Sequence, residues 1–383
     1  MKRILTILGE AQYDVLNVFS LELINGFREY GIIVDIVNAR NGLVLSPYSF
    51  SADYDLVFAF NGMWQLEFTD ALLRDKKVPV WSFLVDHPLH HHKRLLDAHC
   101  NQIVSCIDRK HVKYVKDYYK NNNHVLYMPH GGILSYAEKG FDARKYDVSF
   151  FGTYKDPAET IKPLHHYNDS MKRLVHQLIN EVYRNPERTM EDALDGLLKS
   201  LGVPASDEEF REILKELDFA DEYLRNKKRH DVVEAVVRHG IKVDVFGTGW
   251  EKFQDGGGCL RIHEPLGFHD VLLEMAESKI VLNTMPLFTD GSHERIFNSM
   301  GAKCICFTDK SSYLDEIFQH GEELFYFSMN ELDKLPIMVK AVLRKEYDIE
   351  SIIEKAYGSV MKKHLWKHRA KEILDCLDKM KFE

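Results

Sequence analysis

Short apolar runs that alternate with helical patterns constrain the fold of this chain more than any other feature. Within residues 1–150 the runs are branched or aromatic and do not alternate with polar residues, which is typical of strands buried on both faces. The intervals hold helical patterns, one of which closes on Gly31. This repetition predicts a doubly wound parallel sheet with strands at Ile4–Leu8, Ile32–Val37, Leu56–Phe60, Val78–Val85, Ile103–Cys106 and Val125–Met128.

The same pattern restarts near residue 146 and continues after a long polar interruption. The interruption, at about 160–239, is helical in its periodicity, and Ser206 with Glu209 forms a capping-box signature inside it. We therefore predict an α/β protein with two Rossmann-like domains. The N-terminal domain covers 1–145, the C-terminal domain covers 146–360 and carries the helical insertion, and a last helix lies in 361–383.

Composition excludes several classes of protein. The 383 residues suffice for two or three domains of ordinary size. A net charge of −9, from 59 acidic and 50 basic residues, argues against a nucleic-acid partner. No apolar segment approaches the roughly 18 residues of a transmembrane helix, and the N-terminus is too short for a signal peptide. The six cysteines form no C-x-x-C pair, so we expect reduced thiols and a cytoplasmic protein.

Polar residues follow nearly every predicted strand. In parallel α/β sheets ligands bind beyond the carboxyl ends of the strands, which makes these residues candidates for a site. Turns prefer the same residue types, so a purely structural role is the alternative at each position. The candidates are Asp86, His87 and His130 in the first half, and Gly152, Thr153, Gly247, Thr248, Gly249, Trp250 and Asn283 in the second.

The segment VDHPLHHHKRL follows the strongest strand of the first half. Histidine is the natural base near neutral pH, and an adjacent carboxylate can orient it, so Asp86 and His87 are candidates for catalysis or acceptor recognition. A metal site is an alternative, but zinc needs three or four converging ligands, whereas the successive residues His90–His92 point in different directions. A structural turn is the other alternative, because Pro88 can open a helix there.

A second informative segment runs from Val281 to Phe318. Ser292 is predicted to cap a helix whose first turn holds His293, Glu294 and Arg295. A helix N-terminus favours anions, and an arginine in its first turn can add a charge-assisted bond to a phosphate. The alternative is a capped surface helix whose first turn is merely solvated.

This segment resembles the C-terminal signature of GT-B glycosyltransferases of the "glycosyl transferases group 1" type, in the CgeB-like subgroup. The resemblance rests on a strand that ends in Asn, a Gly-Ser-His-Glu-Arg loop, a small-residue turn and a strand that ends in Thr-Asp. In this chain these elements are Asn283, Gly291–Arg295, Phe297-Asn298, Met300–Ala302, Thr308-Asp309 and Tyr313–Phe318.

The resemblance implies two Rossmann-like domains that face a cleft, with a nucleotide-sugar donor held mainly by the C-terminal domain. The pyrophosphate would lie near Ser292–Arg295, the base near Gly247–Trp250, and the acceptor on the N-terminal domain. The last helix, in 361–383, would pack back on the N-terminal domain. His130 is a candidate contact to the donor phosphate or sugar. Many such enzymes bind the ribose through a glutamate where this chain has Asn298, so that contact falls to Asn298 or Glu294.

The sequence thus predicts a glycosyltransferase that moves a sugar from a nucleoside diphosphate, such as UDP, to a hydroxyl on a glycan, a protein or a small molecule. No metal or further cofactor is expected, because the helix N-terminus, His293 and Arg295 can stabilise the departing diphosphate. A nucleotide-sugar epimerase or hydrolase and a non-catalytic binding module are the alternatives. The basic run RNKKRH at 225–230 is interpreted as a solvated face of the insertion, with contact to an acidic partner as the alternative.

Overall fold

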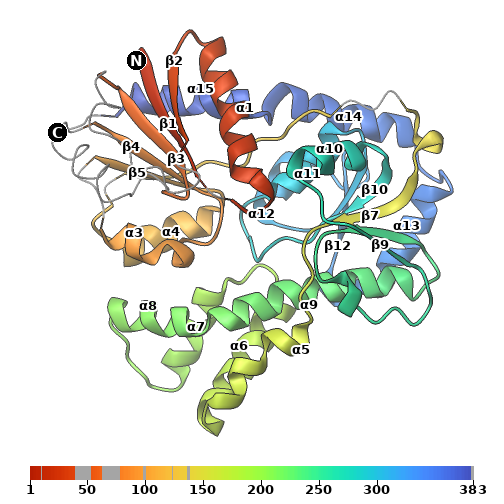
Figure 1. The fold of residues 1–383 in the computed structure, drawn as a ribbon. Coiled ribbons are helices and arrows are strands. Elements are labelled where there is room, and N and C mark those ends of the chain that lie inside the picture. Colours follow the sequence, from red (N-terminus) through yellow and green to blue (C-terminus); the bar gives the residue numbers. More distant parts are fainter. Residues whose placement is uncertain are drawn as a thin grey trace. The chain divides into compact units, whose positions relative to one another are not determined.

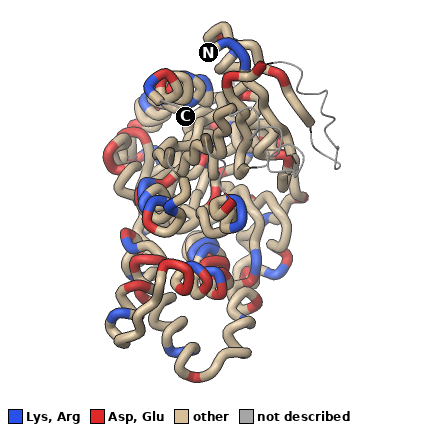
Figure 2. Tube along the Cα trace, turned by 90° about the vertical axis from the view of Figure 1, so that its left-hand side faces the viewer, with Lys and Arg blue, Asp and Glu red and all other residues tan. Residues whose placement is uncertain are grey.

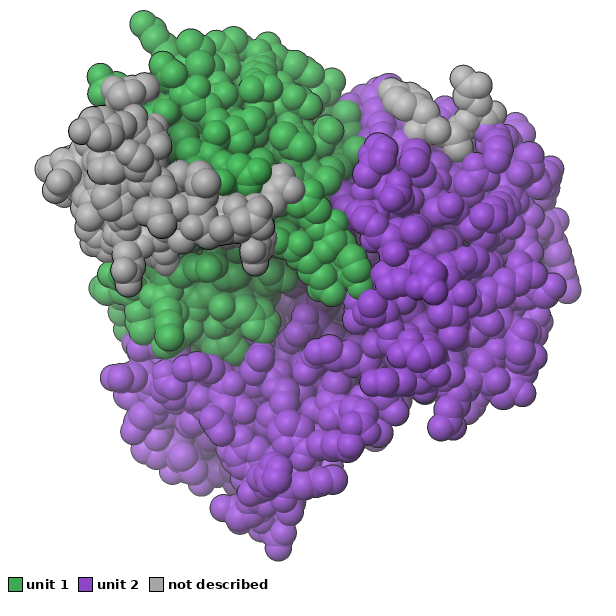
Figure 3. Space-filling view, viewed as in Figure 1, with its two compact units in different colours: residues 1–133, 363–383 green, residues 134–362 purple. Residues whose placement is uncertain are grey.

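The computed structural model describes residues 1–9, 11–38, 53–62, 78–97, 101–122, 124–135 and 139–380. The chain divides into two compact units, which Figure 3 shows in two colours. Unit 1 comprises Met1–Ile133 and Lys363–Glu383, and unit 2 comprises Leu134–Lys362. Each unit contains a six-stranded parallel sheet with helices, which confirms the predicted fold class.

Unit 1 is built on a sheet with strand order β2-β1-β3-β4-β5-β6, in which every neighbouring pair is parallel. All residues of β3, β4 and β5 are buried, as expected for apolar strands covered on both faces. Each predicted run is a strand to within two residues at either end. The strands are β1 (Arg3–Leu8), β2 (Ile33–Asn38), β3 (Leu56–Phe60), β4 (Val80–Leu84), β5 (Gln102–Cys106) and β6 (His124–Tyr127).

The helices described in unit 1 are α1 (Val15–Glu29), α3 (His92–Leu96), α4 (Arg109–Tyr118) and α15 (Trp366–Leu377). The last of them, α15, packs against α1, so the end of the chain joins its beginning (Figure 1). Trp366 is buried among the rings of Phe19, Phe60 and Phe83. A Cβ on Gly131 would lie only 2.5 Å from the Trp366 ring, so a glycine is required where this tryptophan meets the chain.

Unit 2 is built on a sheet with strand order β12-β11-β10-β7-β8-β9, again parallel throughout. The chain passes from β7 to β8 and β9 on one side, then returns to β10 and continues to β11 and β12 on the other. The strand order therefore reverses between β7 and β10. The strands are β7 (Tyr146–Phe151), β8 (Val243–Phe246), β9 (Leu260–His263), β10 (Ser278–Leu282), β11 (Ile305–Asp309) and β12 (Phe325–Phe327).

A group of helices lies between β7 and β8, at the place of the predicted insertion (Figure 1). Its members are α5 (Pro157–Thr160), α6 (Asp169–Arg184), α7 (Met190–Ser200), α8 (Asp207–Glu216) and α9 (Asp218–Val237). The capping box of Ser206 and Glu209 is confirmed at the start of α8. The end of α9, with Val232, Val233, Val236 and Val237, belongs to the same apolar core as the sheet. This helix therefore forms part of the Rossmann-like layer.

The remaining helices of unit 2 are α10 (Phe268–Ala276), α11 (Glu294–Gly301), α12 (Ser312–Ile317), α13 (Leu335–Leu343) and α14 (Ile349–Lys363). Within the described ranges, no helix combines the length and the apolar character needed to cross a membrane. Figure 2 shows acidic and basic residues intermixed along much of the trace. The described cysteines are unpaired, and Cys106, Cys304 and Cys306 are buried, in keeping with the expectation of reduced thiols.

Candidate functional site

The candidate site of unit 2 lies where the strand order of its sheet reverses. At such a switch point the loops diverge beyond the carboxyl ends of two neighbouring strands and leave room for a ligand. Here the two strands are β7 and β10, which pair directly. Gly152 and Thr153 follow β7, and Asn283 follows β10, so three predicted residues leave the strands that flank this point.

The loop after β7 runs against the loop after β8. The backbone N–H of Tyr154 donates to the carbonyl oxygen of Thr248 at 2.9 Å. A Cβ on Gly249, whose φ is 88°, would lie 2.1 Å from the carbonyl oxygen of Tyr154, so only glycine permits this approach. The Trp250 ring is fully buried, and its indole N–H donates to the carbonyl oxygen of Gly152 at 2.8 Å. Trp250 therefore supports the loop from the core side.

The helix α11 begins beside the end of β10. Its N-cap is His293, whose Nδ1 lies 3.3 Å from the backbone nitrogen of Arg295. The prediction of Ser292 as the cap is wrong by one residue, because the chain enters the helix later. Ser292 is fully buried, and its hydroxyl has no hydrogen-bond partner among the described residues. The Arg295 guanidinium donates to Oδ1 of Asn283 at 2.9 Å, which holds the arginine at the end of β10.

A second arginine, Arg229 of α9, lies beside Arg295 and is absent from the predicted site residues. Both guanidiniums stand over the ring of Phe150, at 5.6 Å and 5.5 Å from its centroid. A Cβ on Gly152 would lie 3.9 Å from Cζ of Arg229 and 3.8 Å from Nη2 of Arg295. Gly152 at the switch point is thus adjacent to two positive charges. We call Arg229 and Arg295 the arginine pair.

Neither member of the arginine pair forms an ion pair with a carboxylate among the described residues. Among the described residues no hydrogen bond or ion pair reaches Arg229, and its Nε is buried. Burial, followed by repulsion from Arg295 and Arg225, lowers the pKa of Arg229 to about 9, so it is still a cation at neutral pH. Burial also lowers the pKa of Arg295, and nearby Glu294 opposes that shift. Two like charges held this way are unfavourable, and a bound anion would relieve them.

The basic run on α9 contains a signal that the sequence interpretation overlooked. Leu224, Lys228 and Val232 are spaced by four residues and all three are buried. Lys228 makes a buried ion pair with Asp309 at 2.8 Å, at the end of β11. The interpretation of this run as a solvated face is therefore wrong for Lys228. The helical phase that buries Lys228 also turns its neighbour Arg229 toward the end of the sheet.

Other polar residues surround the arginine pair. Nδ1 of His293 lies 2.8 Å from Oε2 of Glu294. Burial lowers the pKa of His293, while Glu294 opposes the shift. Asn298 is buried within α11, with 1% of its surface exposed. The structure brings eight of the predicted residues together at this end of the sheet: Gly152, Thr153, Gly247, Thr248, Asn283, His293, Glu294 and Arg295.

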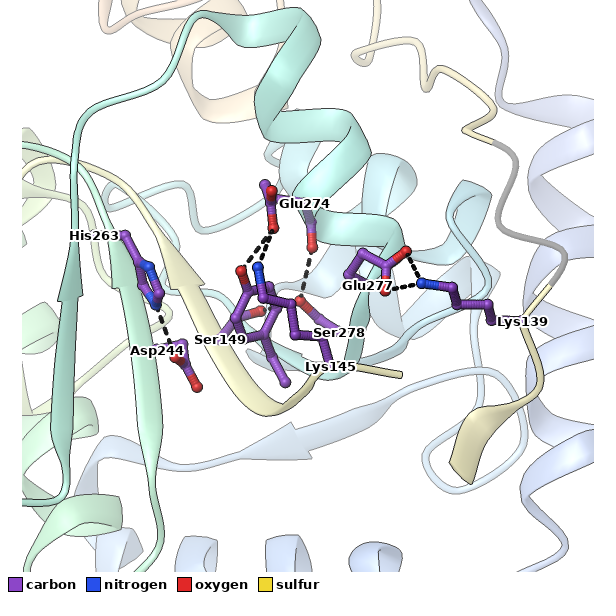
Figure 4. A network of polar contacts seen from close by, with 9 residues as sticks. Lys139, Lys145, Ser149, Asp244, His263, Glu274, Glu277 and Ser278 are labelled. Carbon is purple, nitrogen blue, oxygen red and sulfur yellow. Dashed lines mark hydrogen bonds and ion pairs between the residues drawn. The ribbon is translucent and has the colours of Figure 1, made fainter. Parts of the chain in front are cut away.

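A different polar cluster of unit 2 is drawn in Figure 4. Here Nε2 of His263 lies 2.7 Å from Oδ1 of the buried Asp244. Two lysines reach two carboxylates on and just after α10: Lys139 lies 2.7 Å from Glu277, and Lys145 lies 3.8 Å from Glu274. Each of the two lysines has a carboxylate partner, and the His263 ring lies within hydrogen-bond distance of one. We call this set the paired network, and it has the character of a structural element.

In unit 1 the predicted catalytic residues stand at the carboxyl end of β4. Nδ2 of Asn61, which follows β3, donates to Oδ2 of Asp86 at 3.1 Å, and Asp86 is exposed. His87 caps the short helix η3 (Pro88–His91), and its Nδ1 accepts from the backbone N–H of Leu89 at 3.1 Å. A neutral His87 with Nδ1 as acceptor carries its proton on Nε2. The geometry therefore leaves the Asp86 carboxylate as the better proton acceptor of the two.

The three histidines after Leu89 do not converge. His90 is exposed, His91 is buried, and Nδ1 of His92 lies 3.0 Å from the hydroxyl of Tyr119. Burial lowers the pKa of His91 to about 4, and neither of its ring nitrogens has a hydrogen-bond partner among the described residues. Three successive residues in these different surroundings do not form one metal-binding set.

His130, the remaining candidate of unit 1, is 2% exposed. Its ring packs edge-on against Phe19 and Trp366, at centroid distances of 5.8 Å and 6.2 Å. Within unit 1 this residue is part of the aromatic core under α15. Its surroundings depend on a helix that lies more than two hundred residues further along the chain, which a local motif does not reveal.

Part of the chain matches a known protein-family model. Residues 225–375 match a protein-family model described as glycosyl transferase-like. This matched segment contains both members of the arginine pair. A search of curated proteins finds no match to the sequence.

Solved structures resemble the chain over almost its whole length. T4 phage BGT in complex with its UDP-glucose substrate has a TM-score of 0.53 and 11% identity, covering 99% of this chain and 100% of that one. Anabaena HepE in complex with UDP has a TM-score of 0.52 and 10% identity, with the same coverage. Sucrose-phosphate synthase from Thermosynechococcus elongatus has a TM-score of 0.54 and 8% identity, covering 99% of each chain. The protein has the GT-B fold of these glycosyltransferases.

Proposed function

We propose that the protein is a glycosyltransferase that moves a sugar from a UDP-sugar to a hydroxyl acceptor. The observation that carries this proposal is the arginine pair, which places two guanidiniums over one ring at the switch point of unit 2, with no hydrogen-bond or ion-pair partner for Arg229 among the described residues. A diphosphate is the ligand that two such guanidiniums would hold best. The UDP and UDP-glucose bound by proteins of the same fold support uridine as the nucleoside.

The donor would occupy the loops at the carboxyl end of this sheet. The diphosphate lies between Arg229 and Arg295, and the base lies near the loop of Gly247 and Thr248. Glu294 or Asn298 contacts the ribose. As the bond between the sugar and the diphosphate breaks, negative charge grows on the leaving oxygen, and the arginine pair stabilises it electrostatically. Because the pair supplies two positive charges, the reaction needs no metal ion or further cofactor.

Unit 1 supplies the groups that act on the acceptor. The acceptor hydroxyl loses its proton to the Asp86 carboxylate, its oxygen attacks the anomeric carbon, and the nucleoside diphosphate leaves with the bonding electrons. The Nε2–H of His87 donates a hydrogen bond that orients the acceptor. The hydrogen bond from the backbone N–H of Leu89 to Nδ1 of His87 supports the assignment of Asp86 as the base and His87 as the donor, because it occupies Nδ1 and leaves the proton on Nε2.

Finer assignments follow from the residues as proposals. The segment Val281–Phe318 supports membership of the CgeB-like subgroup. The reduced cysteines support a cytoplasmic enzyme. The net charge of −9 disfavours nucleic acid and leaves a glycan, a protein or a small molecule as the acceptor.

Turnover of a panel of UDP-sugars, with and without candidate acceptors, tests the proposal. We expect Asp86→Asn to lower transfer by about 100-fold or more, as for loss of a general base, with UDP affinity unchanged. His87→Ala is expected to cost activity much more than affinity, and His91→Ala to do little to either. Equal losses in His91→Ala and His87→Ala would overturn the roles assigned here.

The same panel separates the alternative functions. A wild-type protein that consumes UDP-sugar equally well without acceptor is an epimerase or hydrolase. A protein that binds UDP but turns over no donor is a binding module. A protein that neither binds nor turns over any nucleotide sugar contradicts the proposal altogether.

A further inference from the structure

Asn61 connects the end of β3 to the residues at the end of β4 that the proposed reaction uses. It directly follows β3, and its backbone N–H donates to the carbonyl oxygen of Phe83 in β4 at 2.8 Å. Asn61 is buried, with 8% of its surface exposed, whereas Asp86 beside it is exposed. The proposed reaction assigns no role to this buried amide.

The backbone around Asn61 forms a turn that is held from two sides. Asn61 has a φ of 52° and Gly62 a φ of 65°, in the left-handed region that asparagine, aspartate and glycine adopt more readily than other residues. The carbonyl oxygen of Asn61 accepts a hydrogen bond from the guanidinium of Arg94, in α3. A Cβ on Gly62 would lie 3.2 Å from Cδ of Arg94 and 3.2 Å from Oγ of Ser82, in β4. The turn is therefore packed against both α3 and β4, which fixes the place from which the Asn61 side chain starts.

The two ends of the Asn61 amide contact two successive residues after β4. Its Oδ1 accepts from the backbone N–H of Val85 at 3.0 Å, and its Nδ2 donates to Oδ2 of Asp86 at 3.1 Å. Because a backbone N–H can only donate, the amide oxygen must face Val85, and the amide nitrogen then faces Asp86. An aspartate at this position could make the first hydrogen bond but not the second, since an ionised carboxylate only accepts.

The hydrogen bond from Asn61 fixes one oxygen of the Asp86 carboxylate. Among the described residues it is the only hydrogen bond that this carboxylate accepts. An exposed aspartate without such a bond would exchange among several side-chain rotamers. The bond to Oδ2 restricts this exchange and leaves Oδ1 for the proton of the acceptor hydroxyl. A base that is held in place before the acceptor arrives makes a larger contribution to the rate than a mobile one.

We propose that Asn61 is a positioning residue for sugar transfer, whose amide holds Oδ2 of Asp86 so that Oδ1 takes the proton of the acceptor hydroxyl. This inference rests on the proposed function. The proton moves from the acceptor oxygen to Oδ1, that oxygen bonds to the anomeric carbon, and the nucleoside diphosphate leaves with the electrons of the broken bond. Asn61 exchanges no proton in this step and acts only through Asp86. The alternative is that Asn61 serves the turn alone, through its backbone conformation and its bond to Val85.

The variant Asn61→Asp separates these two roles. Aspartate also adopts the left-handed region and can accept from Val85, so the turn is kept, but the donor to Asp86 is replaced by a second carboxylate. We expect kcat to fall about tenfold or more, while KM for the UDP-sugar and the affinity for UDP stay unchanged. A kcat equal to that of the wild type would overturn the inference.

The variant Asn61→Gly tests the same role without a new charge. Glycine adopts the backbone conformation freely, and the substitution removes both side-chain hydrogen bonds. We again expect kcat to fall about tenfold or more with KM for the UDP-sugar unchanged. This variant decides the question if Asn61→Asp does not fold, and an unchanged kcat here would also overturn the inference.

Asn122 provides the matched control, because it is another buried asparagine of unit 1. It is 7% exposed, and its Nδ2 donates to the carbonyl oxygens of Leu95 and Tyr119 at 2.9 Å and 3.1 Å. Asn122→Asp turns a carboxylate toward these carbonyls, so the midpoint of urea unfolding should fall while kcat of the folded protein stays unchanged. A loss of kcat as large as that of Asn61→Asp would overturn the inference.

Release of UDP from UDP-glucose, UDP-galactose and UDP-N-acetylglucosamine, with p-nitrophenyl glucoside or water as the acceptor, measures kcat and KM. In the background of Asp86→Asn, the change Asn61→Gly should cause no further loss, because Asn61 acts only through Asp86. An equal loss from Asn61→Gly in both backgrounds would overturn the inference. A wild-type protein that releases no UDP from these donors contradicts the proposed function and the inference with it. An active wild type with an equally active Asn61→Asp overturns the inference alone.

Discussion

Unit 2 contains two polar clusters of opposite character. In the paired network of Figure 4, Lys139, Lys145 and His263 each meet a carboxylate at 2.7 Å to 3.8 Å. In the arginine pair, by contrast, two guanidiniums share one aromatic ring, and Arg229 has no hydrogen-bond or ion-pair partner among the described residues. Opposite charges that pair with each other stabilise the folded state. Like charges that lie close together without such partners raise the free energy of the folded state, and binding of an anionic ligand would explain their presence.

The sharpest way to break this comparison is to remove the arginine pair. We expect Arg229→Gln/Arg295→Gln to lower UDP affinity by about 100-fold or more, because each charge-assisted phosphate contact contributes roughly 1.5–3 kcal/mol. The free energy of unfolding without ligand should change by little, since the end of a repulsion offsets the loss of the hydrogen bond from Arg295 to Asn283. Calorimetric titration and urea unfolding measure the two effects. Arg238→Gln, at the exposed end of α9, is the matched control and should change neither.

The buried ion pair of Lys228 and Asp309 provides the opposite test. Lys228 is the neighbour of Arg229 in the sequence, but it has a carboxylate partner, so its loss should destabilise the fold. Lys228→Met leaves a carboxylate buried without its partner, which costs about 3–5 kcal/mol of unfolding free energy. Lys227→Met, one residue away at a more exposed ion pair, should cost about 1 kcal/mol or less. Similar unfolding midpoints for the two variants would contradict this distinction.

His91 extends the comparison to unit 1, where an unpartnered group is buried in its neutral form. Because its folded pKa is about 4, against 6.5 for an ordinary histidine, the unfolded chain takes up the extra proton first as pH falls. The contribution to stability is complete above pH 6.5 and is lost between pH 6.5 and 4. At pH 5 the loss is on the order of 2 kcal/mol.

Urea unfolding at pH 7.5 and pH 5 measures this effect in the wild type and in His91→Gln. The variant should lose less stability on acidification than the wild type. Some acid sensitivity should persist in both, because burial also lowers the pKa of His111, and lowers that of His364 to about 3. Identical pH slopes would show that His91 is not held in a neutral form.

The smallest effect is expected in the paired network itself. Lys139 is half-exposed, so its ion pair with Glu277 is screened by solvent. Lys139→Gln should change the free energy of unfolding by less than about 1 kcal/mol and should leave UDP affinity unchanged. A marked loss of UDP binding in this variant would remove the distinction between the two clusters.

The strands and the residues that leave them could be predicted from the sequence. Runs buried on both faces have a clear local pattern, and the rule for parallel sheets then places Gly152 and Asn283 at the switch point. Arg229 could not be placed this way, because it reaches the site only through the packing of α9 on the sheet. The spacing of Leu224, Lys228 and Val232 by four residues does predict that Lys228 is buried. The direction of the neighbouring Arg229 side chain on α9 follows from that prediction.

Two other differences have similar causes. Ser292 and His293 can both cap a helix, so the sequence alone does not decide which of them does. His130 follows a strand and stays a predicted ligand contact, but its packing against Trp366, which the last helix of the chain brings there, could not be predicted from its local pattern. Local patterns therefore predict which strand end a residue occupies, but packing between distant segments decides what that residue contacts.

Calorimetric titration of the wild-type protein with UDP and with uridine tests the central claim most directly. The claim is that the arginine pair of unit 2 is a site for a diphosphate. It predicts that UDP binds at least about 100-fold more tightly than uridine and that the difference shrinks as salt rises. Equal affinities for UDP and uridine, or no binding of UDP at all, would contradict it.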